Sequence, residues 1–200
     1  MGDFAILTVC SGNICRSPLA EQLLRAGLGS YPGVTVASAG TVGLVGEPMD
    51  ERAQQLAAGF GVTDAAKHVA RELSAVQIAE ADLVFAMSRE HRRAIVQLHP
   101  RSSRYTFTIR EFARIAAEVE DSDLIDAALL AADDVAGRFA VAVQAAASLR
   151  GIVTPLQDAD DDDVIDPYRR SDDVYTLSGQ QLAPAVIAAL DLLNRAAKVV

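Results

Sequence analysis

The chain has 200 residues, half of them hydrophobic, and a formal net charge of −9. This length fits one domain with a substantial core, and the acidic balance argues against a partner that is nucleic acid or an acidic membrane surface. Two cysteines and three histidines are too few for a disulfide framework and give no zinc-ligand spacing. We find no apolar run of membrane-spanning length and no signal-like start, so we expect a cytoplasmic protein without a metal.

Seven elements are predicted before residue 110, and apolar runs typical of strands alternate with amphipathic patterns typical of helices. The strands are expected at residues 4–9, 34–40, 81–87 and 105–109, and the helices at residues 18–28, 50–61 and 89–99. Such alternation implies a parallel sheet with right-handed crossovers. We therefore predict the α/β class, with a four-stranded parallel sheet in a flavodoxin-like three-layer sandwich. In such sheets the ligand lies beyond the carboxyl ends of the strands.

The rest of the chain is expected to be helical. An alanine-rich pattern without a strand runs from Arg110 to Leu149 and predicts two helices that are broken near residues 120–123. An acidic segment at residues 158–173 is expected to be a solvated loop. A closing amphipathic helix is predicted at residues 178–198, despite Pro184.

The stretch VCSGNICRSP follows the first predicted strand directly. A strand that ends at Cys10, a short loop, and a helix that starts at Ser17-Pro18 would form a cup of backbone N–H groups for a tetrahedral dianion. Gly12 is expected to supply the strained backbone of a tight cup, and Arg16 to grip two phosphate oxygens. The same positive field favours the thiolate form of Cys10, which is then placed for in-line attack on phosphorus.

This spacing of cysteine and arginine is by itself a weak signal, because a cysteine at the end of a buried strand is more often an inert core residue. The strand–loop–helix setting, the glycine and the Ser-Pro pair strengthen the functional interpretation. A Walker A loop is excluded because no Gly-Lys-Ser/Thr follows, and a single glycine excludes a dinucleotide-binding loop. The phosphate-binding residues are expected to be Ser11, Gly12, Asn13, Ile14, Cys15, Arg16 and Ser17.

The stretch VCSGNICRSPLAE resembles the active-site signature of the low-molecular-weight protein tyrosine phosphatases, and DPY at residues 166–168 resembles their general-acid loop. The order of the motifs distinguishes this family from the classical and dual-specificity phosphatases, because the loop is N-terminal, Val9 precedes Cys10, and the acid lies far downstream. The motifs SAGT, HVARELS and ADLVFAMSREH and the terminal helix also resemble the family. The resemblance covers most of the chain except roughly residues 110–163.

The resemblance implies three catalytic residues, with Cys10 as the nucleophile, Arg16 as the phosphate clamp and Asp166 as the general acid. The reaction that it implies is hydrolysis of phosphotyrosine through a phosphocysteine intermediate, without a metal or an organic cofactor. A phosphotyrosine protein or peptide is the expected partner, and a cognate tyrosine kinase is a further candidate.

The resemblance also implies residues that support the site. Tyr168 is expected to flank the substrate ring, and Arg169 stands where many relatives have a second aromatic residue, which favours acidic peptides. Because the loop must curl around one phosphate, we expect Cys15 to lie close to Cys10 and to be its redox partner. A polar network that holds the loop and the thiolate is expected from Asn13, Ser17, Ser38 and His68, with the Ser17 hydroxyl donating to the Cys10 sulfur.

Three alternatives remain open at this point. Arsenate reduction uses the same loop in relatives of this scaffold, although the thioredoxin-coupled kind needs further cysteines and only a small-thiol transferase fits. Protein arginine phosphatases typically have Thr at the position of Ile14. A non-catalytic phosphate-binding module would not need Cys10 and Asp166 together.

The chain is expected to be a single phosphatase domain over residues 1–200, with a helical insertion at roughly residues 110–157. Relatives join the fourth strand to the acid loop far more briefly. The insertion is interpreted either as a cover or self-association surface, or as a solvated helical hairpin without a role, since surface insertions are well tolerated.

Overall fold

The computed structural model describes residues 2–154 and 156–200. One sheet of four parallel strands is found in this part of the chain, and its order, 2-1-3-4 by strand number, is flavodoxin-like. The predicted fold class is therefore confirmed. The strands are β1 (Phe4–Cys10), β2 (Val34–Gly40), β3 (Leu83–Ala86) and β4 (Thr106–Thr108).

Helices and short 3-10 turns form the connections between the strands and the C-terminal part. The helices are α1 (Arg16–Leu28), α2 (Glu51–Gly59), α3 (Ala75–Ala79), α4 (Arg89–Leu98), α5 (Ile109–Ala116), α6 (Ile125–Ala128), α7 (Val135–Leu149) and α8 (Asp172–Lys198). The 3-10 turns are η1 (Ala65–Lys67), η2 (Pro100–Arg104), η3 (Asp121–Leu124) and η4 (Ala159–Asp162).

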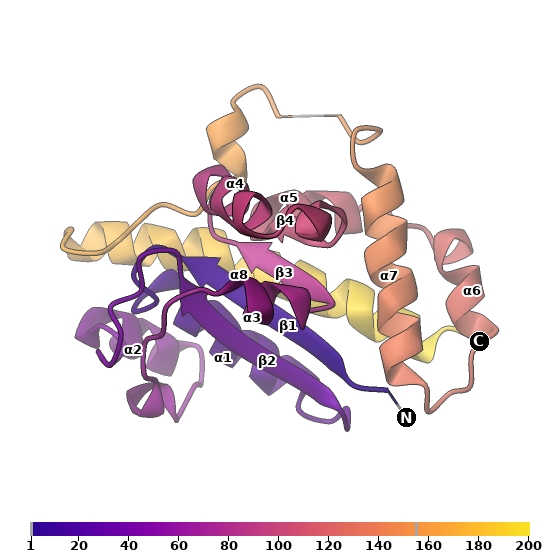
Figure 1. Cartoon of the computed structure of the whole chain (residues 1–200), viewed down its shortest axis with the longest axis horizontal. Coiled ribbons are helices and arrows are strands. Elements are labelled where there is room, and N and C mark those ends of the chain that lie inside the picture. The colour runs from indigo at the N-terminus through magenta and orange to yellow at the C-terminus, as the bar shows by residue number, and fades with distance from the viewer. Residues whose placement is uncertain (1, 155) are drawn as a thin grey trace.

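The helices cover both faces of the sheet. Phe4 and Ile6 of β1 belong to the larger core, which also contains side chains of α1, α5, α7 and α8. The alternate residue Leu7 packs in a smaller core with Ile78 of α3 and Ile95 of α4, as the two-residue period of a strand requires. In Figure 1 the long helix α8 passes behind the sheet, with α3 on the side of the viewer. This arrangement is the predicted three-layer sandwich.

Helix α8 begins at Asp172, six residues earlier than the predicted start at Ser178. The acidic residues Asp172 and Asp173 lie in its first turn, where negative charge interacts favourably with the helix dipole. Tyr175 is buried there, which ties this turn to the core. The sequence pattern placed these residues in the acidic loop because their charge is equally typical of a loop.

The alanine-rich segment forms three helices rather than the predicted two, with η3 at the expected break. It is not a solvated hairpin, because Phe112, Leu124 and Phe139 are fully buried in the larger core. The ring of Phe139 lies edge-on to the rings of Phe4 and Tyr31, with centroid distances of 5.3 and 5.4 Å. Helix α7 is therefore part of the structural core of the domain.

Replacing Phe139 with alanine is expected to lower the free energy of unfolding by about 3–5 kcal/mol, the usual cost of truncating a buried phenylalanine. Chemical denaturation of the two proteins measures this difference. Leu129 is a matched control, because it is 80% exposed and its replacement by alanine is expected to change stability by at most about 0.5 kcal/mol. Equally small losses in both variants would show that α7 packs only loosely on the domain.

Candidate active site

The loop after β1 lies at the point where the chain connections leave the sheet in opposite directions. Strand β1 pairs with both β2 and β3, and such a switch point leaves a crevice at the carboxyl ends of the strands. A pocket of about 190 Å³ lies there. Its lining includes Cys10, Arg16, Asp166, Tyr168, Val42 and Leu44.

The backbone of this loop is turned so that its N–H groups face inward. The carbonyl oxygens of Cys10, Ser11, Gly12 and Ile14 accept hydrogen bonds of 2.8 to 3.1 Å from N–H groups of the neighbouring segment, Thr41, Val42, Leu44 and Asp50. The Asn13 carbonyl accepts from His68 Nε2 at 2.7 Å. Because a trans peptide holds its C=O and N–H on opposite sides, the N–H groups of residues 11–15 point to the inside of the loop. The loop is therefore built as an anion cup.

The strained position of the cup is Asn13 rather than Gly12, so the expectation for Gly12 was wrong. Asn13 has a φ of +57°, whereas a Cβ on Gly12 would meet only ordinary van der Waals contacts. The Asn13 amide holds this conformation by donating to Ser17 Oγ at 3.0 Å and Ser38 Oγ at 2.8 Å. It also accepts from the Arg71 N–H at 2.9 Å. Asparagine adopts positive φ more readily than most residues, and these bonds fix it.

A glycine is required instead at Gly40, the last residue of β2. A Cβ at this position would lie 2.4 Å from the carbonyl oxygen of Ser11 and 3.0 Å from the backbone nitrogen of Asn13. Any side chain at Gly40 would therefore push the cup out of shape. This close approach gives a physical reason for the glycine in the SAGT motif.

Ser17 lies beside the candidate nucleophile, where the family resemblance led us to expect it, but it does not cap the helix, which begins one residue earlier than the predicted start at Ser17-Pro18. Helix α1 begins at Arg16, and its N-cap residue Cys15 makes no side-chain capping bond. Ser17 Oγ instead lies 3.0 Å from Cys10 Sγ while it accepts from the Asn13 amide. The positive end of α1 is thus directed at the cup, with a hydroxyl beside the sulfur.

Sequence reasoning missed Glu21, a buried acid that joins the expected network. It accepts a hydrogen bond from Ser38 Oγ and lies 4.0 Å from His68 Nδ1. Burial lowers the pKa of His68, so at neutral pH the ring is neutral and donates from Nε2 to Asn13. The available signal was the position of Glu21 four residues after Ser17, on the same face of α1.

Arg16 connects the cup to the segment that carries the candidate acid. Its guanidinium lies 2.8 Å from Asp166 Oδ2 and donates from Nη1 to the carbonyl of Val164 at 3.0 Å. The buried Nε–H has no acceptor among the described residues. Buried donors are rarely left unpaired in proteins, so this one is available to an anion in the cup.

The DPY segment lies at the mouth of the pocket. The Asp166 side chain is 50% exposed and accepts from the Tyr168 N–H at 3.2 Å. Tyr168 lines the pocket, and the Arg169 guanidinium lies 5.0 Å from the centre of its ring. The pocket wall at this point is therefore an aromatic ring that has a cation close to it.

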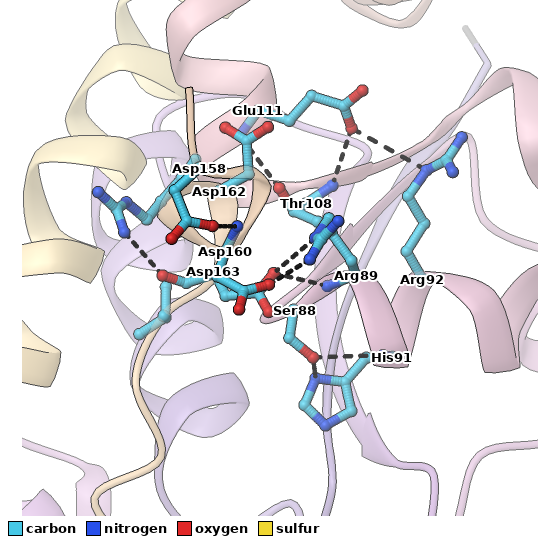
Figure 2. Close-up of polar contacts among 12 residues, drawn as sticks. Ser88, Arg89, His91, Arg92, Thr108, Glu111, Asp158, Asp160, Asp162 and Asp163 are labelled. Atoms are coloured by element: carbon cyan, nitrogen blue, oxygen red, sulfur yellow. Dashed lines mark hydrogen bonds and ion pairs between the residues drawn. The ribbon is translucent and has the colours of Figure 1, made fainter. Parts of the chain in front are cut away.

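The acidic segment before DPY is bound to the domain rather than fully solvated, as Figure 2 shows. Asp163 accepts from the backbone N–H of Arg89 at 2.7 Å, and the Arg89 side chain pairs with Asp160. Arg114 of α5 forms an ion pair of 2.9 Å with Asp162. These contacts hold the segment against α4 and α5 and so fix the position from which the DPY segment starts.

The two cysteines differ in their surroundings although both line the pocket. Cys10 contacts Ser17, whereas burial and the nearby Asp50 raise the pKa of the Cys15 thiol. Both cysteines are free. Cys15 is thus held as a neutral thiol beside the candidate nucleophile.

Sequence reasoning also missed His91, which reaches the cup from α4. Its Nε2 lies 2.8 Å from Ser11 Oγ, and its Nδ1 lies 2.7 Å from Ser88 Oγ. The available signal was the location of His91 in the first turn of the helix that follows β3, the strand that adjoins β1 across the switch point.

A cysteine at the base of an anion cup, with a guanidinium and a carboxyl group at its mouth, suits phosphoryl transfer through a thiol. On a flavodoxin-like sheet, this arrangement defines the class of cysteine-dependent phosphatases. Comparison with known proteins agrees with this class. The family model for "Low molecular weight phosphotyrosine protein phosphatase" matches residues 5–128, and the chain belongs to this family.

Individual relatives are similar over part of their length. The low molecular weight protein-tyrosine-phosphatase Ptp of Acinetobacter johnsonii is 41% identical over 104 residues, which are 52% of this chain and 70% of that protein. Etp of Escherichia coli K12 is 46% identical over 96 residues, 48% of this chain and 62% of that protein. Asp166 and Tyr168 lie beyond the family match, so their placement rests on the geometry of the pocket.

Solved structures extend the similarity to nearly the whole fold. The tyrosine phosphatase AmsI of Erwinia amylovora superposes with a TM-score of 0.64 at 25% identity, covering 94% of this chain and 91% of that chain. The arginine phosphatase YwlE of Geobacillus stearothermophilus superposes with a TM-score of 0.65 at 26% identity, covering 96% and 93%. The fold is therefore shared by proteins named for two different phosphorylated residues.

Proposed function

We propose that this phosphatase hydrolyses phosphotyrosine in proteins through a phosphocysteine intermediate. The observation that carries the proposal is the convergence of Cys10, Arg16 and Asp166 on one pocket. A nucleophile, a clamp for phosphate oxygens and a proton donor are the three groups that such a reaction needs. A binding module for phosphate would need only the clamp.

In the first step, Cys10 Sγ attacks phosphorus and the bond to the phenolic oxygen breaks. Asp166, in its protonated form, gives its proton to this oxygen, so tyrosine leaves as a neutral phenol. The inward N–H groups of the cup and Arg16 bind the phosphoryl oxygens, where negative charge is held during transfer. The neutral Cys15 thiol is a much weaker nucleophile toward phosphorus than a thiolate.

In the second step, a water molecule attacks phosphorus and gives a proton to the Asp166 carboxylate. The sulfur–phosphorus bond breaks, and Cys10 leaves as a thiolate while inorganic phosphate is released. Ser17 Oγ, 3.0 Å from the sulfur, supports this step by donating its hydrogen to the thiolate. No part of the two steps calls for a metal or an organic cofactor.

The walls of the pocket favour an aromatic substrate. Val42, Leu44 and Tyr168 line its entrance, and all three are at least 36% exposed, so their apolar surfaces are available to a phenyl ring. Ile14, in the cup itself, is buried and offers no hydroxyl to a guanidinium. These features support phosphotyrosine over phosphoarginine, and the presence of only two cysteines gives arsenate reduction no relay of its own.

A direct assay distinguishes these substrates. We expect turnover of p-nitrophenyl phosphate and of a phosphotyrosine peptide, with lower kcat/KM for a phosphoarginine peptide and no thiol-dependent reduction of arsenate. Faster cleavage of phosphoarginine than of phosphotyrosine would overturn the proposed specificity, and no turnover of any phosphate ester would overturn the proposed activity.

We also propose a cytoplasmic location and a phosphotyrosine protein, phosphorylated by a cognate tyrosine kinase, as the partner. No helix in the described ranges is both long and apolar enough to cross a membrane. A thiol nucleophile works best where thiols are kept reduced, which favours the cytoplasm. Arg169 beside the Tyr168 ring supports substrates with an acidic residue near the phosphotyrosine.

We propose that residues 110–157 are a helical insertion within a single domain of residues 1–200 and that the insertion braces the acid segment. Arg110 Nη1 donates to the carbonyl of Asp163 at 2.7 Å. Arg114 pairs with Asp162 and donates to the carbonyl of Thr154 at 3.2 Å. These contacts support a role in positioning the acid segment rather than a role as a detached cover.

Cys15 is proposed as a redox partner that protects Cys10, and its replacement by serine tests this role. Peroxide oxidises the Cys10 thiolate to a sulfenic acid, and the Cys15 sulfur then displaces the hydroxyl group to form a disulfide and water. Dithiothreitol reduces that disulfide. After peroxide and then dithiothreitol, the Cys15→Ser enzyme is expected to recover several-fold less activity than the unmodified enzyme. Equal recovery in the two proteins would contradict a protective role.

A further inference from the structure

His91 lies beside the catalytic loop, and the proposed mechanism gives it no part. It belongs to the first turn of α4 and is only 4% exposed. Its ring contacts two hydroxyl groups, Ser11 Oγ at 2.8 Å from Nε2 and Ser88 Oγ at 2.7 Å from Nδ1. Figure 2 shows the ring next to Ser88, at the start of the helix. His91 thus links Ser88, the residue before α4, to Ser11 of the cup.

The ring of His91 is neutral at physiological pH. Burial, together with the positive charge of Arg16, lowers the pKa of His91 to about 4. A neutral imidazole has one nitrogen that donates and one that accepts. The hydrogen bonds around the ring therefore decide which nitrogen carries the proton.

Ser88 decides this question. As the N-cap of α4, its hydroxyl oxygen already accepts the backbone N–H of His91 at 3.3 Å. If the Ser88 hydroxyl donates to His91 Nδ1, the Ser88 hydrogen has an acceptor, and the proton of the neutral ring lies on Nε2. The other tautomer would leave the buried Ser88 hydroxyl hydrogen without an acceptor among the described residues, which is unfavourable. The Nε2–H group of His91 therefore donates to Ser11 Oγ.

This direction determines what the Ser11 hydroxyl can do. Because its oxygen accepts from His91, its own hydrogen is free to be donated elsewhere. Ser11 lines the pocket with Cys10 and Arg16, and its carbonyl is held by the Val42 N–H at 3.0 Å. With the backbone fixed, only rotation of the side chain remains, and the bond from His91 removes much of that freedom.

We propose that His91 is a positioning residue that holds the Ser11 hydroxyl as a hydrogen-bond donor to the phosphoryl group in the cup. The inference rests on the proposed function and adds a side-chain donor to the backbone N–H groups. A donor aligned before the substrate arrives stabilises the charge of the transition state without reorganisation. Ser11 would touch the phosphoryl oxygens, and His91 would act only through Ser11.

The test is a double-mutant cycle with Ser11→Ala, His91→Phe and the combined variant. We measure kcat/KM for p-nitrophenyl phosphate and the inhibition constant of vanadate, which reports on the geometry of the transition state. In each single variant, kcat/KM is expected to fall about 10-fold and the inhibition constant of vanadate to rise about 10-fold, the scale of one hydrogen bond to a charged group. The combined variant is expected to be no worse than Ser11→Ala, because the two residues act through the same bond.

His91→Gln provides a test of rescue, since the glutamine amide keeps an N–H donor on a side chain of similar reach. We expect it to recover part of the loss of His91→Phe in kcat/KM and in vanadate inhibition, at equal melting temperature. If His91 served only as packing, the loss in kcat/KM would correlate with the melting temperature of each variant and would not depend on whether its side chain carries an N–H donor. Ser11→Ala removes a small, partly exposed side chain, so it remains informative even if His91→Phe fails to fold.

Three outcomes would overturn the inference. Additive losses in the combined variant would show that His91 does not act through Ser11. Full activity and vanadate inhibition in Ser11→Ala would show that the hydroxyl contributes nothing, and no gain in His91→Gln over His91→Phe would exclude a role for the donor. Because p-nitrophenyl phosphate and vanadate do not depend on the protein substrate, failure here is distinct from failure of the phosphotyrosine assignment.

Discussion

Replacing Cys10 with serine is expected to abolish turnover, with a loss on the order of 10⁶ in kcat, the scale seen when a covalent nucleophile is removed. The serine hydroxyl has nearly the size of the thiol but is a much weaker nucleophile, and the side-chain hydrogen-bond partner at this position among the described residues is the Ser17 hydroxyl, which is not a base. Serine also leaves the inward N–H groups and Arg16 unchanged. The variant should therefore still bind inorganic phosphate, and this binding should raise its melting temperature as it does in the unmodified protein.

Cys15→Ser is the matched control for this experiment, because it changes the same atom in the same loop. Its activity under reducing conditions is expected to stay within a few-fold of the unmodified enzyme. If Cys10→Ser kept substantial activity, the thiol would not be the nucleophile. If it lost both turnover and phosphate binding, the substitution would have disturbed the cup, and the role of Cys10 would have to be tested with an alkylating reagent.

Replacing Asp166 with asparagine is expected to lower kcat/KM for a phosphotyrosine peptide by about 10²–10⁴, the usual contribution of a general acid. The loss should be much smaller for p-nitrophenyl phosphate. Tyrosine must leave as a phenol with a pKa of about 10, so its departure depends on a proton, whereas the more acidic p-nitrophenol leaves with less help. The quantity kcat/KM is the correct measure because it covers only the steps through formation of the phosphoenzyme.

The substitution also changes the contact between Asp166 and Arg16, so phosphate affinity is measured in parallel. Unchanged affinity assigns the kinetic loss to proton donation. Asp161→Asn is a suitable control, since Asp161 is an exposed carboxylate of the same segment and the contacts of Asp160, Asp162 and Asp163 that hold the segment are left unchanged. Equal losses for the two substrates in Asp166→Asn would mean that the proton comes from another group.

The secondary structure could be predicted from the sequence where an element is buried on both faces, because its apolar pattern is then uninterrupted. The run from Phe4 to Cys10 has both faces covered, so an uninterrupted apolar pattern sufficed to predict β1. The start of α8 was missed because charged residues near a helix N-terminus and charged residues in a loop look the same until Tyr175 is known to be buried. Likewise, helical periodicity predicted helices between Arg110 and Leu149 but could not show that Phe139 packs on Phe4.

For the candidate site, residues within one motif could be predicted, whereas residues that packing brings to the site from other elements could not. Cys10, Arg16 and Ser17 lie within one motif; local chemistry was enough to select Cys10 and Arg16, whereas the contact of Ser17 with the sulfur was expected from the family resemblance. The choice of Gly12 as the strained residue was wrong, because the sequence does not show which backbone position turns. Glu21 and His91 were missed because their roles arise from packing between elements, which brings α1 and α4 to the two sides of the cup.

The hydrogen bond from Arg16 to the carbonyl of Val164 joins residues that are 148 positions apart in the sequence. During synthesis at about 5–20 residues per second, the nucleophile loop would leave the ribosome roughly 7 to 30 seconds before the segment that anchors Arg16 and carries the acid. A nascent chain at that stage carries the proposed nucleophile Cys10 but not yet the proposed acid Asp166. The order of the residues along the polypeptide thus separates the proposed catalytic groups in time during synthesis, so we expect a partly made chain to be inactive until the segment that carries Asp166 has emerged.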